Sequence, residues 1–326
     1  MVLQNLEKYT KLSEVYQDWR HTQMLLRIAN ERLKNLNPTQ VHILMENIIM
    51  HRLLGNEQPV VRDLFQGVQD DSIYAGFQAI RTAPSTEWVH EIKTIMQLPW
   101  ESSQMEPTIS LSQDELRVGS FIQAAVSPVK RLISVAKDLY AHEEALYYVA
   151  RCALRYASIY AKTRHIGPPQ IVYDHFYSWG VRNEGFASPF NARLLGKPDG
   201  RFFSLFPDTD AVFGSQGSMF LSTRDNHEGA WSLDPPFIPE TMTKTVRLIK
   251  EWRTNKQCPA ILLIVPTSFT PSYTPAETVQ LYASTHYYTG LEGVLRPLPV
   301  DVSIHRYGSL PGFDAQKVIQ GYLPVP

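Results

Sequence analysis

The sequence has little cysteine and lacks any long hydrophobic run. Its two cysteines, Cys152 and Cys258, form no CxxC pair, so we expect neither a disulfide framework nor a cysteine zinc site. No stretch of about 18 apolar residues occurs, which argues against a membrane span. Residues 1–19 are polar throughout and do not resemble a signal peptide. These absences predict an intracellular protein without a membrane partner.

An excess of charge of either sign is also missing. The chain has 31 Lys and Arg against 32 Asp and Glu, which leaves a net charge of -1. A basic surface over the whole protein is thereby excluded, although a local basic patch for nucleic acid is not. The 10 histidines are scattered and include no HxxxH pair, so no metal site is expected.

Length and composition favour two globular domains. The chain has 326 residues, of which 44% are hydrophobic, and this is enough for more than one core. Residues 1–165 read as helices and predict an all-helical domain, a possible site for RNA or a partner protein. Within it, residues 98–115 are polar and contain proline and serine, and they predict a surface loop or linker.

Two helical stretches are well marked in this first half. Asn37 can cap a helix whose first turn holds Pro38, and helically spaced apolar residues then continue to Gly55. The second stretch, residues 129–165, also repeats apolar residues at three or four residue steps. A break is possible near Ala141.

The pattern changes at about residue 166, and residues 166–326 predict an α/β domain. Helical spacing predicts a helix over residues 241–255, and short apolar runs predict strands or short elements at 170–180, 184–190, 210–214, 229–233 and 260–266. The order strand, helix, strand is a βαβ unit, which implies a mostly parallel sheet. Ligands of such sheets gather beyond the carboxyl ends of the strands.

The segment DPPF follows the strand expected at 229–233. An adenine amine is a poor nucleophile, because its lone pair is delocalised into the ring, and an enzyme that methylates it must orient the amine. The carboxylate of Asp234 and the backbone carbonyl of Pro235 can accept its two hydrogens. Pro236 fixes φ, and Phe237 can stack on the base. An ordinary strand exit is the alternative, because Asp favours turns and proline cannot continue a sheet.

Four segments in order resemble the cap-specific adenosine-N6 methyltransferase family of the phosphorylated-CTD-interacting-factor type. They are FASPFN (186–191), FPDTD (206–210), FGSQG (213–217) and DPPF (234–237). The resemblance implies a class I, Rossmann-like methyltransferase domain over 166–326 behind the helical domain. It also implies S-adenosylmethionine as methyl donor, and the first transcribed adenosine of capped RNA as substrate. A nuclear location follows from the resemblance, with a cytoplasmic one as the alternative.

The chain departs from the family at three places. Asp234 stands where the family has Asn, and a carboxylate can accept at both oxygens where an amide has one acceptor and one donor. Ile238-Pro239-Glu240 replaces Cys-Glu-Glu after the DPPF segment. Residues 265–269, VPTSF, replace the family's Ile-Pro-Glu-Trp-Arg. Cap recognition is altered if those family residues contact the cap.

Other candidate residues follow from the resemblance, each with an alternative. Ser188, Pro189 and Asn191 line the donor pocket, or they mark a helix start or turn. Asp208 and Asp210 bind the donor's ribose hydroxyls, as an acid after a second strand often does, or Asp208 caps a turn. The expected donor-binding residues are Ser188, Pro189, Asn191, Asp208, Asp210 and Asp234.

Substrate contacts are expected from both halves. Arg151 and Arg155 lie one helical turn apart, with Lys162 and Arg164 following, and they contact an RNA backbone or form a solvated helix face. Tyr287 and Tyr288 stack on a base or pack in the core. The expected substrate-binding residues are Phe237, Glu240, Arg151 and Arg155.

Three classes of function remain open. The leading interpretation is an RNA adenosine-N6 methyltransferase, whose target base must be unpaired, terminal or flipped out. One alternative is a methyltransferase-like subunit without catalysis that binds RNA or a partner protein. A further alternative is a DNA adenine-N6 methyltransferase, but residues 1–165 show no groove-reading motif.

Overall fold

A computed structural model describes residues 10–54, 60–100, 105–161, 165–222, 229–255, 259–291 and 293–324. The chain divides into two compact units. The first unit comprises Met1–Ala125 and Ala136–Thr163, and the second comprises Val126–Val135 and Arg164–Pro326. Residues 127–135 of helix α6 (Ser127–Leu139) therefore belong with the second unit, although we expected the whole helix in the N-terminal domain.

Helices form most of the first unit. They are α1 (Leu12–Arg32), α2 (Pro38–Leu54), α3 (Val61–Phe65), α4 (Asp70–Ala79), α5 (Thr86–Met96) and α7 (His142–Ala157). The predicted cap of α2 is confirmed, because Asn37 Oδ1 accepts from the N–H of Gln40 at 2.9 Å, and Gln40 Oε1 accepts from the N–H of Asn37 at 3.0 Å. The predicted break is also confirmed, since α6 ends at Leu139 and α7 starts at His142.

The expectation of an all-helical first domain is wrong. Strands β1 (Ile109–Leu111), β2 (Glu115–Val118) and β3 (Phe121–Ala124) form a three-stranded antiparallel sheet. Part of the predicted loop at 98–115 is therefore strand. In β2 Leu116 and Val118 are buried and Arg117 is exposed, which is the alternation of a half-buried strand. Runs of three or four residues are too short for this period to stand out from sequence.

A six-stranded mixed sheet forms the centre of the second unit. Its strands are β4 (Val181–Gly185), β5 (Arg201–Phe202), β6 (Ala230–Leu233), β7 (Ala260–Pro266), β8 (Glu277–Leu281) and β11 (Val302–Gly308), in the order β5-β4-β6-β7-β11-β8. The first four strands in this order are parallel. Strand β11 is antiparallel to β7 and to β8. Strand β8 therefore runs in the same direction as the four parallel strands, and of these six strands β11 alone is reversed. The predicted mostly parallel sheet is confirmed.

The predicted βαβ unit is confirmed as β6, α10 (Pro239–Thr254) and β7. Two of the segments expected as strands or short elements are short helices. Residues 170–178 form helix α8 (Gln170–Ser178), and residues 211–213 form a 3-10 helix, η3 (Ala211–Phe213). Short apolar runs do not distinguish a strand from a buried helix. Only the first two residues of the expected element at 184–190 lie in a strand, at the end of β4.

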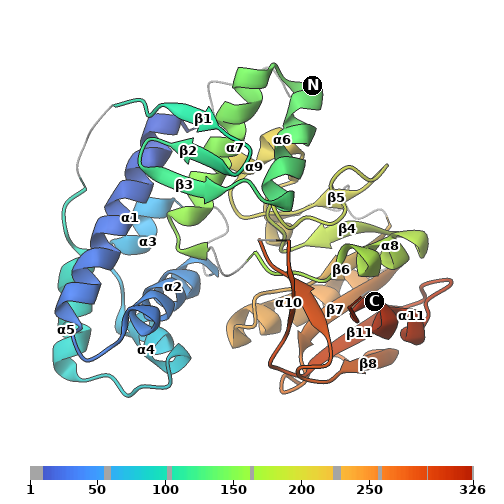
Figure 1. Cartoon of the computed structure of the whole chain (residues 1–326). Helices are drawn as coiled ribbons and strands as arrows, with labels where there is room; N and C mark the ends of the chain where they lie inside the picture. The colour runs from blue at the N-terminus through green and yellow to red at the C-terminus, as the bar shows by residue number, and fades with distance from the viewer. Residues whose placement is uncertain are drawn as a thin grey trace. The chain divides into compact units, whose positions relative to one another are not determined.

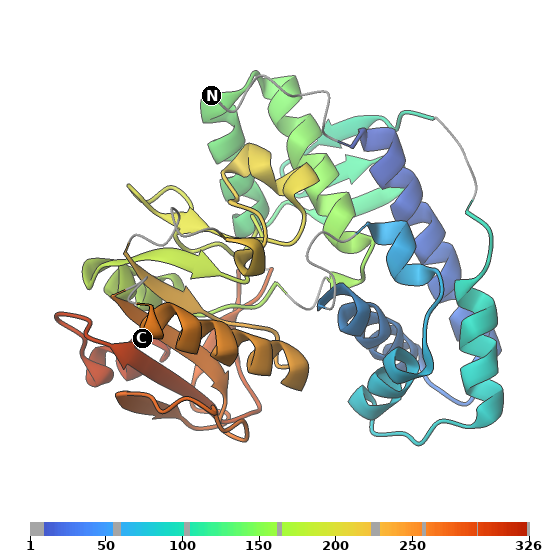
Figure 2. The same ribbon diagram turned by 180° about the vertical axis from the view of Figure 1, so that it is seen from behind.

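Helices cover both faces of this sheet. Residues Ala260, Leu262 and Ile264 of β7 face one core, and Ile261, Leu263 and Val265 face the other, as the two-residue period of a strand requires. Helices α8 and α11 (Ala315–Gly321) pack into the first core, and α10 packs into the second (Figures 1 and 2). No helix in the described part of the chain is long and apolar enough to span a membrane.

The remaining elements of the second unit are short. Helix α9 (Pro207–Asp210) and η3 follow β5, and a second 3-10 helix, η4 (Met219–Leu221), precedes β6. Strands β9 (Tyr287–Thr289) and β10 (Leu295–Pro297) follow β8 and precede β11 along the chain. They pair antiparallel in a separate two-stranded sheet.

Candidate functional site

The direction of strand order reverses beside β4. From β4 the chain passes to β5 on one side and then to β6 on the other. Gly185, the last residue of β4, is paired with Leu233, the last residue of β6. Phe186 and Asp234 therefore leave the sheet side by side at its carboxyl edge. Open α/β sheets bind ligands outside the carboxyl ends of the strands at such a reversal, so this edge is the candidate site.

The end of β4 is a tight turn. A Cβ on Gly185 would lie 2.6 Å from Leu233 Cδ2 and 2.9 Å from Met219 Sδ, so the close packing of the strands needs glycine here. The next residue, Phe186, has φ +63°, a left-handed conformation that is uncommon for a bulky side chain. The N–H of Ala187 then donates to the carbonyl of Phe203 at 2.9 Å, and this bond holds the turn against the chain after β5.

A buried acid anchors the loop that follows this turn. Glu184 is 4% exposed, and its Oε2 accepts from the N–H groups of Arg193 at 2.7 Å and Leu194 at 2.9 Å. Burial raises the pKa of the Glu184 carboxyl to about 7, and the two N–H groups and the Arg193 charge oppose that rise. Sequence reasoning missed this residue, although an acid within a buried strand is a signal in itself.

Two arginines hold the same loop from outside the sheet. The guanidinium of Arg131, on α6, donates to the carbonyl of Ala192 at 2.9 Å. Arg193 Nε donates to the carbonyl of Pro168 at 2.9 Å. Burial lowers the pKa of both guanidinium groups, but each remains cationic beside Glu184. The loop between residues 186 and 194 is thus fixed by charged groups on both sides.

The carboxyl of Asp234 lies on the face of the sheet that α8 and α11 cover. It follows Ser232 by two residues, and Ser232 Oγ donates to the hydroxyl of Tyr173 on α8 at 3.2 Å. Asp234 is partly buried. Burial raises the pKa of its carboxyl to about 8, and the negative charge of Glu184 adds to the rise.

Three buried tyrosines surround this carboxyl closely enough to interact with it electrostatically. They are Tyr173, Tyr288 and Tyr322. The rings of Tyr288 and Tyr322 lie 5.5 Å apart, near enough for each to influence the pKa of the other. Neither hydroxyl has a partner at normal hydrogen-bond geometry among the residues that the structure describes. Burial raises the pKa of all three phenols, so they are neutral donors at physiological pH.

The strand register explains how Tyr288 reaches this edge. Leu281 at the end of β8 pairs with Val302, and Val302 pairs with Pro266 at the end of β7. The segment between β8 and β11 therefore emerges at the carboxyl edge of the parallel strands. Of the two interpretations of Tyr288, buried packing agrees with its 4% exposure, whereas stacking on a base does not.

The DPPF segment leaves one carbonyl open. The carbonyl of Pro236 accepts from the N–H of Ile238 at 2.6 Å, whereas the Pro235 carbonyl receives no backbone hydrogen bond from the described residues. Phe237 is partly buried and packs against the core beneath α8 and α11. Glu240 is exposed in the first turn of α10.

The predicted donor-binding residues on the FASPFN segment form a turn. Ser188 Oγ lies 3.0 Å from Asn191 Oδ1, which also accepts from the N–H of Ser188 at 2.6 Å. His165 Nδ1 lies 2.9 Å from the same Oγ, and burial lowers the pKa of its imidazole to about 4. Pro189 is buried. These contacts agree with the turn interpretation of Ser188 and Asn191.

The two acids after β5 differ. Asp208 is partly exposed, whereas Asp210 is fully buried and accepts from the hydroxyl of Thr209 at 2.9 Å. Because Phe202 is level with Glu184 in the sheet, α9 follows the strand next to β4 at the same edge. Asp208 is therefore the better placed of the two for a ligand.

Arg151 and Arg155 are not surface residues, which corrects both interpretations of them. They are 2% and 5% exposed. Arg155 pairs with the buried Asp18 at 3.1 Å, and the guanidinium of Arg151 lies 5.3 Å from the ring centre of Tyr148. Contact with RNA phosphate would require both side chains to leave these partners.

The sequence also led to expectations about metal sites, the two cysteines and two further basic residues. Lys162, Arg164 and Cys258 lie outside the described residues. Cys152 is buried and forms no disulfide with another described residue. No cluster of three or more His, Cys, Asp or Glu side chains that could hold a metal ion occurs within the described ranges.

The fold and the site together define a mixed α/β protein with a candidate ligand-binding edge at the reversal of strand order. Residues 137–291 match the family described as phosphorylated CTD interacting factor 1 WW domain. The matched range contains all four segments of the predicted resemblance and runs from the last turn of α6 to just beyond β9. Over these residues, a little under half of the chain, the protein is similar to the phosphorylated-CTD-interacting-factor family, as the four segments predict. A search of curated proteins found no match.

Proposed function

We propose that the chain is an RNA adenosine-N6 methyltransferase that uses S-adenosylmethionine and acts on the first transcribed adenosine beside the cap. The observation that carries this proposal is the position of Asp234-Pro235-Pro236-Phe237 at the carboxyl end of β6, beside the turn that ends β4. The match of residues 137–291 to the family supports the cap-adjacent target.

A Rossmann-like, class I methyltransferase fold is part of the proposal. Four parallel strands, helices on both faces and the reversal between β5 and β6 around β4 are features of doubly wound sheets. The antiparallel β11 between β7 and β8 adds a strand without disturbing the carboxyl edge where the ligands would bind. Under this proposal residues 166–326 are the catalytic domain.

Two acceptors at the edge suit an exocyclic amine. The Asp234 carboxyl and the open Pro235 carbonyl follow each other along the chain and can each accept one amine hydrogen. Accepting both hydrogens turns the nitrogen lone pair out of the plane of the base. Since the two acceptors are fixed by a strand end and two prolines, the amine is oriented before reaction.

The residues at the edge fit the methyl donor. S-adenosylmethionine, when bound, supplies a methyl group on a positively charged sulfur. Asp208 offers a partly exposed carboxylate for ribose hydroxyls, on the loop after the strand next to β4. The turn at Phe186 lies at the strand reversal, and a bound sulfonium would favour the ionised forms of the nearby Glu184 and Asp234 carboxyls.

The base would enter beside Phe237 and the tyrosine hydroxyls. The side chain of Phe237 is only partly buried, so part of its ring is available for stacking. The hydroxyls of Tyr288 and Tyr322 interact with each other outside normal hydrogen-bond geometry, so a polar ligand could offer either of them a better partner. An adenine must be unpaired to reach such a position, and a 5′ terminal nucleotide meets this condition without unpairing.

One observation favours a second candidate, a subunit that binds RNA or a partner without catalysis. Where the family has Glu-Trp-Arg, Thr267 hydrogen-bonds within the fold. Its Oγ1 lies 2.8 Å from Ser303 Oγ, and its N–H donates to the carbonyl of Asp301 at 2.9 Å. Phe269 packs against the core under α10. These residues are engaged inside the protein, which would leave fewer groups for the cap.

Methylation of defined RNAs tests the proposal. The purified chain is incubated with labelled S-adenosylmethionine and short RNAs that begin with adenosine, with or without a cap, and the products are digested to nucleosides. N6-methyladenosine on capped RNA alone supports the full proposal, and methylation of both RNAs removes cap recognition from it. Failure to methylate RNA, together with no thermal stabilisation by the donor, would favour the non-catalytic subunit. A nuclear location is part of the proposal and is tested by imaging the tagged chain.

A further inference from the structure

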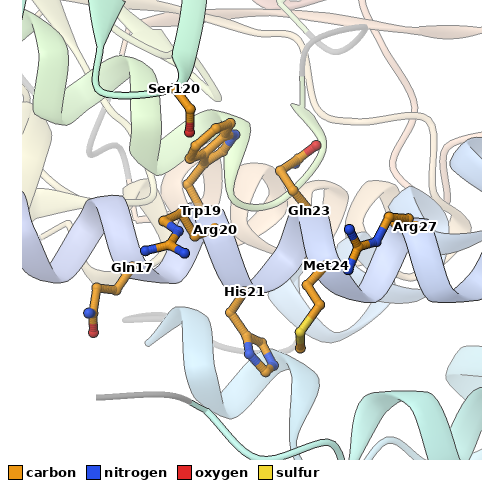
Figure 3. A pocket seen from close by; sticks show the side chains of 8 residues that line it. All are labelled: Gln17, Trp19, Arg20, His21, Gln23, Met24, Arg27 and Ser120. Carbon is orange, nitrogen blue, oxygen red and sulfur yellow. The ribbon is translucent and has the colours of Figure 1, made fainter. Parts of the chain in front are cut away.

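A pocket of about 440 Å³ lies in the first unit, on one side of α1. The residues around it include Gln17, Trp19, Arg20, Arg27 and Ser120 (Figure 3). All the lining residues belong to the first unit, so the pocket is separate from the edge that carries Asp234. Neither the family resemblance nor the site in the second unit accounts for it.

The charge of the pocket is positive. Arg20 and Arg27 are exposed, and within the described part of the chain neither forms an ion pair. No Asp or Glu lines the pocket. The two arginines are seven residues apart on the same face of the helix, which places their Cα atoms about 10 Å apart along the axis. Two cations at this spacing suit an anion with charge at more than one point, such as a chain of phosphates.

One wall of the pocket is a fixed aromatic surface. The Trp19 indole stacks on Tyr16 with ring centres 5.6 Å apart and meets the edge of Phe121 at 5.3 Å. The hydroxyl of Tyr16 in turn accepts from the N–H of Ser120 at 3.0 Å. Trp19 is partly exposed, so a rigid indole borders the pocket beside the two guanidinium groups. Flat aromatic and guanidinium groups are what unpaired bases stack on.

We infer that this pocket binds a nucleotide of single-stranded RNA, with its phosphates at Arg20 and Arg27 and its base at Trp19. Glutamine amides from Gln17 and Gln23 add donors and acceptors that can meet a base edge. A phosphorylated peptide would also use the two cations, but a partly exposed indole beside two guanidinium groups is the kind of surface on which an unpaired base stacks. The inference rests on the proposed function, because RNA is the substrate there, and it assigns the first unit a contact with the RNA strand.

RNA binding without turnover tests the inference. The full chain is titrated into a fluorescent 12-nucleotide RNA at several salt concentrations, and anisotropy gives the dissociation constant. The Arg20→Ala/Arg27→Ala variant should bind the RNA at least about tenfold more weakly. The dependence of its dissociation constant on salt concentration should decrease by the amount expected for the loss of about two phosphate contacts. A matched control is Lys34→Ala/Lys137→Ala, which removes two exposed cations of the same unit that do not line the pocket.

Each of the following results either supports or overturns binding of RNA at this pocket. Equal weakening in the arginine variant and in the lysine control would overturn the inference, because charge alone would then explain the loss. Binding of a phosphoserine peptide in place of RNA, with the same loss in the arginine variant, would also overturn it. A Trp19→Leu variant with unchanged unfolding should lose affinity for the 12-mer while an arginine-dependent salt slope remains. The assay measures RNA binding without methyl transfer. A failure of this inference can therefore be told apart from a failure of the proposed reaction.

Discussion

The carboxyl of Glu184 lies close enough to Asp234 for its negative charge to raise the pKa of the Asp234 carboxyl, in addition to the effect of burial. The two acids occupy neighbouring parallel strands at the carboxyl edge, and Glu184 is level with Ser232 two residues before Asp234. Like charges held this close favour a proton on at least one of them. The proposed reaction and the stability of the second unit should therefore both depend on pH.

The first prediction concerns the rate of methylation. The pKa of Asp234 is raised to about 8, and the ionised carboxylate is the stronger acceptor for an amine, so the wild-type rate should rise with pH through about 8. Asp234→Asn keeps one acceptor oxygen and cannot ionise, so its rate should be lower at pH 9 and should lose this rise. Rates at saturating RNA between pH 6 and pH 9 measure both.

Asp234→Ala is the companion variant. It removes the acceptor altogether, and methylation should fall by at least about a hundredfold. Thermal stabilisation by the donor should persist if other residues hold most of it. Turnover near the wild-type level would show that Asp234 does not orient the amine.

The second prediction concerns stability. The native pKa values of Glu184 and Asp234 lie above their ordinary values, so between about pH 4 and pH 8 the folded chain holds protons that the unfolded chain has released. The free energy of unfolding should therefore decrease as the pH rises through this range. Asp234→Asn removes one contribution and should exceed the wild type in stability by about 1 kcal/mol or more at pH 8.5, with little difference at pH 4.

Urea denaturation at pH 4, 7 and 8.5 measures this difference. Glu240→Gln is the control, because Glu240 is exposed on α10 and lies outside the buried pair. A constant difference between Asp234→Asn and the wild type at all three values of pH would contradict the prediction.

The third prediction concerns the first unit. Asp18 is buried and pairs with Arg155 and Arg62, both at 3.1 Å. Asp18→Ala leaves the buried Arg155 without this carboxylate and should lower the free energy of unfolding by about 3–5 kcal/mol. Glu91→Ala, which removes an exposed pair with Arg32, should cost less than about 1 kcal/mol. Similar losses for both variants, measured by urea denaturation, would show that the buried pair is not important for stability.

Local sequence patterns predicted the part of the site that lies on one continuous segment. The buried runs of β6 and β7 and the helical spacing of α10 identified a βαβ unit, and this placed Asp234 at the carboxyl end of a strand. The role of Glu184 depends on which strands pair, because only the parallel register of β4 with β6 brings it near Asp234. The residue pattern of neither strand by itself indicates how the two strands pair.

Long-range contacts also explain the wrong expectations. Arg151 and Arg155 have the four-residue spacing of an exposed charged face, but Asp18, on a helix far away in sequence, makes burial of Arg155 possible. Tyr288 reaches the site because β8 runs in the same direction as β7, so the segment after β8 starts at the carboxyl edge. The pocket on α1 combines residues of one helix face with Ser120 from the β2 to β3 turn. None of these relationships is visible in a short window of sequence.

The fourth prediction separates a ligand-binding hydroxyl from a structural one. The Tyr288 hydroxyl is buried without a normal partner among the described residues, so Tyr288→Phe should leave the free energy of unfolding unchanged or slightly higher. If the hydroxyl meets the base or the donor, kcat/KM for RNA should fall by about tenfold, which equals about 1.4 kcal/mol of transition-state stabilisation. Tyr173→Phe is the matched comparison, because its hydroxyl accepts from Ser232 and its loss should reduce stability by about 1 kcal/mol. Unchanged kinetics in Tyr288→Phe, with an unchanged free energy of unfolding, would show that this hydroxyl contacts neither the base nor the donor.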